Sequence, residues 1–204
     1  MTIRLRRLLI VAAAAFALLA IAGPAAASAG TGSTVRLDGV STTLTTDTAT
    51  TGVLVSHGII PLPVGPATVT PVVNNGIALR YRFPITGGMV DATTLAGYIK
   101  HSGGLRFLNL ANGKTLTLTN FKILIGAHPG LTAAVNGDSS VRVRILNLDL
   151  SGASVDKDVP WVTVSNVKAT LTKTAADALN GSLGVGLFAR GITLGTAQVH
   201  AHIG

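Results

Sequence analysis

The densest group of polar and aromatic side chains lies between residues 97 and 104, where the chain reads Gly-Tyr-Ile-Lys-His-Ser-Gly-Gly. Tyr98 offers a phenol and His101 an imidazole, two groups that hydrogen-bond ligands or coordinate metals. Arg80 and Arg82 are two residues apart, so on a strand their guanidinium groups share one face and could hold a small anionic ligand. We therefore take Tyr98, His101, Arg80 and Arg82 as candidate ligand-binding residues. The alternative is structural: Tyr98 in the core, His101 at a turn and both arginines on a solvated face.

A second candidate lies near the C-terminus, where His200 and His202 flank one alanine. On a strand, two residues at this spacing point to the same side, so both imidazoles could bind one metal ion. A third ligand would be needed, and no spacing in the sequence marks one. A solvated strand end is the alternative interpretation.

Catalytic constellations are missing from the sequence. There is no Cys, which excludes disulfides, Cys-ligated metals and cysteine nucleophiles, and all eight acidic residues are Asp. No Gly-x-Ser-x-Gly elbow occurs. Asp156 and Asp158 flank a lysine in a segment that we expect to be an exposed loop. We predict that the protein is not an enzyme, because an exported enzyme would have to rely on Asp91, Asp156 or His101 alone.

The first 29 residues have the pattern of a secretory signal peptide. Arg4, Arg6 and Arg7 precede a 15-residue apolar run from Leu8 to Ala22, and small residues then offer cleavage after Ala27 or Ala29. The run is short for a membrane span, and no second run of 18 apolar residues follows. We predict a signal peptide at 1–29, a single domain at 30–204, no transmembrane span after processing, and a secreted or cell-wall location.

The mild positive charge permits anionic partners, but the scarcity of aromatic residues argues against nucleic acid. The chain carries 16 Lys and Arg against 8 Asp, a formal charge of +8, and three of those arginines leave with the leader. Aromatic residues make up only 4% of the chain, whereas binding of single strands relies on aromatic stacking. Cell-envelope components or a small molecule are the partners that we expect.

Alternation of apolar with polar residues predicts β-strands along most of the chain. The predicted strands cover 77–83, 105–110, 114–119, 121–127, 141–150, 161–172 and 192–203, with a hairpin turn at Asn112-Gly113. One short helix is predicted at Ala175–Leu179, with Thr174 as its N-cap. The predicted fold is mainly β: a two-sheet antiparallel sandwich or a flattened barrel with one short helix near the C-terminus.

A weak internal repeat accompanies these strands. Thr43-Leu44-Thr45 followed by Ala49 resembles Thr170-Leu171-Thr172 followed by Ala176. Each copy would form a strand, a short turn or helix, and another strand. The two copies are expected to cover opposite ends of the molecule.

The segment around the tyrosine cluster resembles the HtaA-type domain of secreted and cell-surface actinobacterial proteins. The resemblance rests on Phe83-Pro84-Ile85-Thr86-Gly87-Gly88, on Asp91, and on Gly97-Tyr98-Ile99-Lys100-His101-Ser102-Gly103-Gly104-Leu105-Arg106-Phe107. It extends from about Leu79 through the Asn120-Phe121 strand and Leu131-Thr132-Ala133, roughly 120 residues. It implies a β-rich fold at the cell surface and haem as a ligand.

The haem residues of that family do not carry over to this chain. The family's tyrosine lies in an early aromatic segment, but residues 34–76 contain no Phe, Tyr or Trp. The family's histidine precedes the hairpin glycine, where this chain has Asn112. Tyr98 and His101 could replace them chemically. We therefore expect a secreted, non-catalytic surface protein that binds haem or another small ligand; the alternative is a structural or interaction module of the envelope without a small ligand.

Overall fold

The computed structural model describes residues 34–204 except 74, 92, 93 and 95, so the predicted signal peptide lies outside the described residues. These described residues form twelve strands and two helices. The elements are β1 (Thr34–Thr46), α2 (Thr48–Ser56), β2 (Ile59–Val64), β3 (Thr68–Val73), β4 (Ile77–Asp91), β5 (Gly97–His101), β6 (Gly104–Asn109), β7 (Thr115–Ile125), β8 (Gly130–Val135), β9 (Asp138–Asp149), β10 (Ser154–Asp158), β11 (Trp161–Leu171), α3 (Lys173–Leu183) and β12 (Thr193–Ile203).

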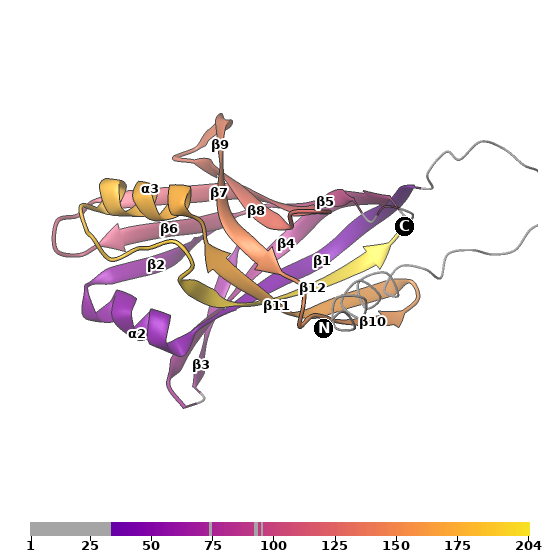
Figure 1. Ribbon diagram of the computed structural model, residues 1–204, viewed down its shortest axis with the longest axis horizontal. Coiled ribbons are helices and arrows are strands. Elements are labelled where there is room, and N and C mark those ends of the chain that lie inside the picture. Colours follow the sequence, from indigo (N-terminus) through magenta and orange to yellow (C-terminus); the bar gives the residue numbers. More distant parts are fainter. Residues whose placement is uncertain (1–33, 74, 92–93, 95) are drawn as a thin grey trace, which may run out of the picture.

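Eight of the strands close into an antiparallel barrel, in the order β7-β5-β4-β1-β12-β11-β9-β8 and back to β7 (Figure 1). The pairing of β7 with β8 closes the ring, so the prediction of a mainly β fold is confirmed and the barrel describes it better than a two-layer sandwich. Four pairings extend the sheet beyond the ring. β6 pairs with β7 and β2 pairs with β6, while β3 pairs with β4 and β10 with β11.

Two tight strand contacts depend on glycine. A Cβ at Gly97, where β5 pairs with the end of β4, would collide with the carbonyl oxygen of Met89. A Cβ at Gly195, where β12 begins to pair with β1, would collide with the carbonyl oxygen of Thr45. Only a residue without a side chain lets the backbones approach this closely.

The predicted hairpin is present, but one strand boundary was wrong. Asn109 N–H donates to the Lys114 carbonyl across the turn (2.9 Å), and Gly113 has a φ of 72°. Asn120 was expected to separate two strands, yet β7 runs through it. The residue adopts a left-handed φ of 52° within a bulge, which asparagine tolerates better than most side chains.

The part of the chain that the structure describes holds two helices, where one was predicted. The C-terminal helix α3 is longer than predicted: it begins after the N-cap Thr172 and ends at Gly184, whose φ of 66° is typical of a C-cap. The unpredicted helix α2 begins after Asp47, whose side chain accepts a hydrogen bond from Thr50 N–H (3.0 Å).

The helices occupy one end of the barrel. Both β1 and β11 are antiparallel to β12, so they run in the same direction, and α2 and α3 follow their C-terminal ends. Figure 1 shows both helices on the same side of the molecule. The expectation that the repeated segments would cover opposite ends was therefore wrong. Within the described residues, no helix is long and apolar enough to cross a membrane.

Candidate functional site

The barrel encloses a cavity of about 650 Å³, within the range of small-molecule sites. Eight-stranded barrels have interiors that are either filled by side chains or hold one small ligand. Aliphatic and phenylalanine side chains from all eight barrel strands line most of this cavity. They include Leu37, Leu44, Phe83, Ile99, Leu118, Phe121, Ile123, Leu131, Ile145, Leu148, Val162, Val164, Val167, Val199 and Ala201.

Helix α3 lies against one end of the cavity. Ala175 and Leu179 face the cavity from the helix and are each only 2% exposed. Their neighbours in the lining are Leu105 and Phe107 of β6 and Leu194 of β12. The amphipathic helix thus buries its apolar side on the barrel interior.

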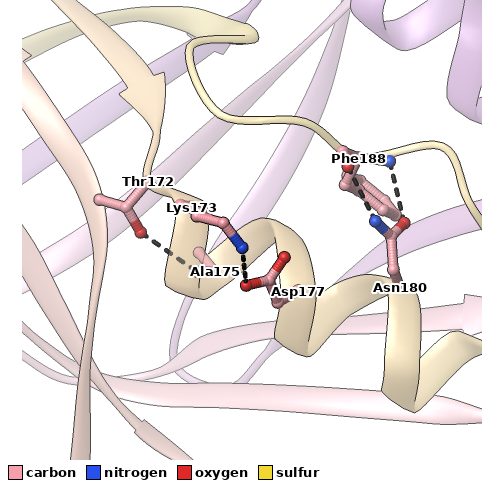
Figure 2. A network of polar contacts seen from close by, with 6 residues as sticks. All are labelled: Thr172, Lys173, Ala175, Asp177, Asn180 and Phe188. Carbon is pink, nitrogen blue, oxygen red and sulfur yellow. Dashed lines mark hydrogen bonds and ion pairs between the residues drawn. The ribbon is translucent and has the colours of Figure 1, made fainter.

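Hydrogen bonds fix this helix at both of its ends. At the start, Ala175 N–H donates to the Thr172 hydroxyl (3.1 Å), which itself donates to the Arg144 carbonyl (2.7 Å). Near the end, the Asn180 amide binds the backbone of Phe188 through two hydrogen bonds of 2.8 and 2.9 Å (Figure 2). Figure 2 also shows an exposed ion pair between Lys173 and Asp177. Because both side chains are exposed to solvent, this pair contributes little to stability.

The cavity reaches the surface at the opposite end. Its lining there includes Thr94 before β5, Pro129 before β8, and Leu150 and Ser151 after β9. Thr94, Leu150 and Ser151 are exposed, whereas the residues of the barrel walls are buried or half-buried. We call this set of loop residues the mouth.

Two carboxylates hold the loops of the mouth. Asp91 accepts hydrogen bonds from Thr94 N–H (2.6 Å) and the Thr94 hydroxyl (3.0 Å). Asp149 accepts one from Ser151 N–H (2.9 Å). Hydrogen bonds from the backbone and side chain of Ser151 hold the pKa of Asp149 below its ordinary value, so this carboxylate is ionised at neutral pH.

One polar pair lies inside the apolar cavity. His101, at the end of β5, and Thr42 of β1 both line it, and they are 4% and 6% exposed. His101 Nε2 lies 2.7 Å from the Thr42 hydroxyl oxygen, and Nδ1 lies 3.3 Å from the Phe121 carbonyl oxygen. A carbonyl oxygen only accepts, so Nδ1 carries the proton and Nε2 accepts from Thr42.

Burial keeps this imidazole neutral. Desolvation lowers the pKa of His101 to about 4, and the hydrogen bond to Phe121 opposes this only in part. Among the described lining residues, the remaining polar side chains are Thr94 and Ser151, both at the mouth. The Thr42–His101 pair is therefore the one polar position deep in the cavity.

Tyr98 and His101 lie on opposite sides of the barrel wall. Tyr98 is stacked beneath the ammonium groups of Lys122 and Lys100, 4.3 and 5.3 Å from its ring centre, and its hydroxyl lies 3.6 Å from the sulfur of Met89. Both lysines and Met89 are outside the set of cavity-lining residues. The structure does not bring Tyr98 and His101 together.

Arg80 and Arg82 share the exposed face of β4, as their spacing indicates. Arg80 Nε donates to the Thr45 hydroxyl (3.4 Å) and Arg82 Nε to the Ser41 hydroxyl (3.0 Å). Neither guanidinium lines the cavity. They form a surface apart from His101, and their binding role stays a prediction.

His200 and His202 also share one face, on which they contact Trp161 of the neighbouring strand. His200 stacks on the indole at 5.3 Å between ring centres, and His202 meets it edge-on at 4.9 Å. His200 Nδ1 is 2.8 Å from the Thr163 hydroxyl. No group of three or more His and Asp residues able to hold a metal occurs in the described part of the chain. Metal binding by this pair stays a prediction.

Sequence reasoning identified His101 but missed Thr42. Thr42 lies in a strand with three other threonines after position 40, and nothing in their spacing distinguishes it. Only the closure of the barrel shows that β1 and β5, which flank β4, place these two side chains in contact.

Comparison with known proteins agrees with this architecture. The family model for HtaA, described as Htaa, matches residues 64–187, more than half of the chain. The chain therefore belongs to the HtaA family of haem-transport-associated domains.

Two solved structures share its fold. The C-terminal domain of HtaA from Corynebacterium glutamicum aligns with a TM-score of 0.56 and 15% identity, over 82% of this chain and 99% of that one. A histidine-to-alanine variant of the same domain, crystallised as a domain-swapped dimer, gives a TM-score of 0.51 and 16% identity, over 90% and 99%. No curated protein matches the chain.

The cavity residues do not fit haem. Haem iron takes an axial His, Tyr, Met or Cys, and His101 is the only such side chain among the described lining residues. Both of its ring nitrogens are already hydrogen-bonded. No Lys or Arg lines the described cavity to pair with haem carboxylates. The charged groups around the mouth are of both signs: Asp91 and Asp149, and Arg144, which donates to the Pro129 carbonyl (2.8 Å). The buried Tyr81 donates its hydroxyl to the Pro61 carbonyl (2.7 Å) and does not line the cavity.

Proposed function

We propose that this HtaA-type domain is a non-catalytic binding module of the cell surface that holds one small apolar molecule inside its barrel. The observation that carries the proposal is the 650 Å³ cavity, which is closed by α3 at one end and reaches the surface at the other. Burial of an apolar ligand there would be driven by the hydrophobic effect. The haem-transport-associated family supports a transport role rather than a catalytic one.

Nile red, an uncharged apolar dye whose emission rises in dry surroundings, tests this proposal. The protein should take up one dye per barrel. Ala201→Phe, which adds a ring to the cavity wall, should reduce dye binding at least tenfold. The matched control is Gln198→Phe on the exposed side of the same strand. Equal dye binding by both variants, or none by the unmodified protein, would refute the proposal.

Haem binding, which the family resemblance implies and which the cavity residues do not fit, has its own test. A hemin titration followed in the Soret region should give no shift that depends on His101 or Tyr98, because neither residue has the surroundings of an iron ligand. A saturable shift lost in His101→Ala would overturn our view that the cavity does not fit haem.

Export and surface location belong to the same proposal. They are supported by the signal-peptide pattern at 1–29 and by the family, whose members occur in cell-surface and secreted actinobacterial proteins. Fractionation should place the mature protein in the wall or medium, beginning at Gly30 or Ser28. Recovery in the cytoplasm with residues 1–29 intact would contradict it.

A role as an interaction module of the envelope is the second candidate, and one observation favours it. The β3–β4 hairpin projects from the barrel (Figure 1) and exposes Val73 and Ile77, at 81% and 61%. Exposed apolar side chains on a sheet edge favour contact with another protein. Crosslinking from these positions in intact cells tests this role, and loss of the adducts in Val73→Lys would support it.

A further inference from the structure

We propose that the ligand of this barrel is an uncharged lipid-like alcohol, an apolar chain whose hydroxyl donates a hydrogen bond to Thr42. This inference rests on the proposed function and names the class of molecule that the cavity selects. It follows from three properties of the cavity: its apolar walls, the absence of Lys and Arg from its described lining, and the hydrogen-bonding state of its one internal polar pair.

The walls select an apolar chain. From the helix-covered end to the mouth, the described lining is aliphatic and phenylalanine apart from Thr42, His101, Thr94 and Ser151. A group with several polar atoms would lose its contacts with water and find few partners inside. An alkyl or isoprenoid chain has no hydrogen bonds to water to lose when it enters the cavity.

The charges select against anions. No Lys or Arg lines the described cavity, and the pKa of His101 lies near 4, so the imidazole is neutral at pH 7. Asp91 and Asp149 hold the loops of the mouth. The Arg144 guanidinium also lies at the mouth, where it donates to the Pro129 carbonyl (2.8 Å), so the mouth carries charges of both signs. A fatty-acid carboxylate that passed the mouth would find no counter-charge among the described lining residues.

The Thr42–His101 pair selects a ligand that can donate a hydrogen bond. The Thr42 hydroxyl uses its proton on His101 Nε2, and His101 uses its Nδ1 proton on the Phe121 carbonyl. Both protons of the pair are therefore committed, while the lone pairs of the Thr42 oxygen remain able to accept. An alcohol satisfies this acceptor, whereas an ether or a ketone has no proton to donate.

Displacement of Nile red by four probes tests the assignment. They are dodecan-1-ol, dodecanoate, dodecane and hemin, at pH 7.5, so that the first three share one chain length and differ in head group. Dodecan-1-ol should displace the dye at a concentration at least tenfold lower than dodecanoate. Hemin should not compete.

Thr42→Val tests the hydrogen bond, since valine keeps the shape and removes the hydroxyl. The substitution should weaken the binding of dodecan-1-ol by about 3- to 10-fold, the equivalent of one neutral hydrogen bond, and should leave the binding of dodecane unchanged. Thr42→Ser, which keeps a hydroxyl at this position, should retain the affinity for dodecan-1-ol. Thr163→Val on the outer face should not change that affinity. Circular dichroism checks that each variant is folded. If Thr42→Val does not fold, the displacement of Nile red from the unmodified protein and from Thr42→Ser still tests the preference for the alcohol.

The outcomes separate this inference from the proposed function. If Nile red enters and Ala201→Phe blocks it, but dodecanoate or hemin displaces it as well as the alcohol does, only the assignment of an alcohol is overturned. Equal losses for dodecane and dodecan-1-ol in Thr42→Val would also overturn it. If Nile red does not enter at all, both proposals fail.

Discussion

Two histidine–threonine pairs of the same kind occur in this protein, one inside the barrel and one outside. His101 lies 2.7 Å from Thr42 in the cavity, and His200 lies 2.8 Å from Thr163 on the outer face. The first pair is buried; the second is half-buried, and Trp161 stacks on its imidazole. The hydrogen bonds are alike in length, so we expect access to water, rather than bond length, to determine how much each pair contributes to stability.

The largest difference should appear when each imidazole is removed. His101→Ala leaves the Thr42 hydroxyl and the Phe121 carbonyl without a partner in a buried site, and should lower the free energy of unfolding by about 2–4 kcal/mol. His200→Ala should cost less than about 1 kcal/mol, because water replaces the lost contact. Urea unfolding at pH 7.5 measures both. Equal losses would refute the comparison.

Acid should weaken the fold mainly through the inner pair. The pKa of His101 is about 4 in the folded state, against an ordinary value of 6.5, so the unfolded chain binds a proton between these pH values and the folded chain does not. The stability is fully present above pH 6.5 and is lost as the pH falls toward 4. From pH 7 to pH 5 the unfolding free energy should drop by about 2 kcal/mol.

His101→Gln is the control for this pH dependence, since a glutamine amide can still donate and accept hydrogen bonds but does not titrate. No other titratable side chain lines the described cavity. The variant should lose most of the drop between pH 7 and pH 5, whereas His200→Gln should keep it. An unchanged slope in His101→Gln would show that other groups govern acid stability.

Removal of the threonine hydroxyls should give a smaller difference in the same direction. Thr42→Val leaves Nε2 of a buried imidazole without its donor and should cost about 1–2 kcal/mol. Thr163→Val, beside a half-buried imidazole, should stay within about 0.5 kcal/mol. Thermal unfolding at pH 7.5 compares them. A cost for Thr163→Val that matched that of Thr42→Val would contradict the role of burial.

The smallest effect should concern metal ions at the outer pair. Trp161 is the only tryptophan, and it contacts both His200 and His202. Cu²⁺ bound by these two imidazoles would quench the fluorescence of Trp161. Because only two ligands are available here, the binding should be weak and a chelator should reverse it at once. His202→Ala should abolish the quenching and His101→Gln should not. Quenching that survives in His202→Ala would exclude this pair as the site.

Strand composition and turn chemistry were the parts of the fold that local sequence could predict. The alternation in 161–172 and 192–203 corresponds to β11 and β12, and Asn112-Gly113 forms the expected turn. Helix α2 was missed because its sequence, Thr-Ala-Thr-Thr-Gly-Val-Leu-Val-Ser, is rich in β-branched residues. The Asp47 cap and packing beside β4 outweigh that preference.

The candidate site was predicted only in part, for a reason of geometry. The type of His101 and its place before a glycine-rich turn are visible in the sequence, but its partner lies 59 residues away. Bulges determine which side chains of a strand face the interior of the barrel. The register shift between Gly39 and Ser41 places the Thr42 side chain there. Long-range closure and bulges are properties of the whole ring, so residue spacing could not reveal the cavity.

The position of the last strand has a consequence for how the molecule is assembled. β12 lies between β1, the first strand of the ring, and β11. Until it is in place, two long strand edges remain unpaired and the interior stays open along its length. Because the chain emerges N-terminus first during synthesis or translocation, the barrel cannot close around its cavity before residues 193–203 are available to pair.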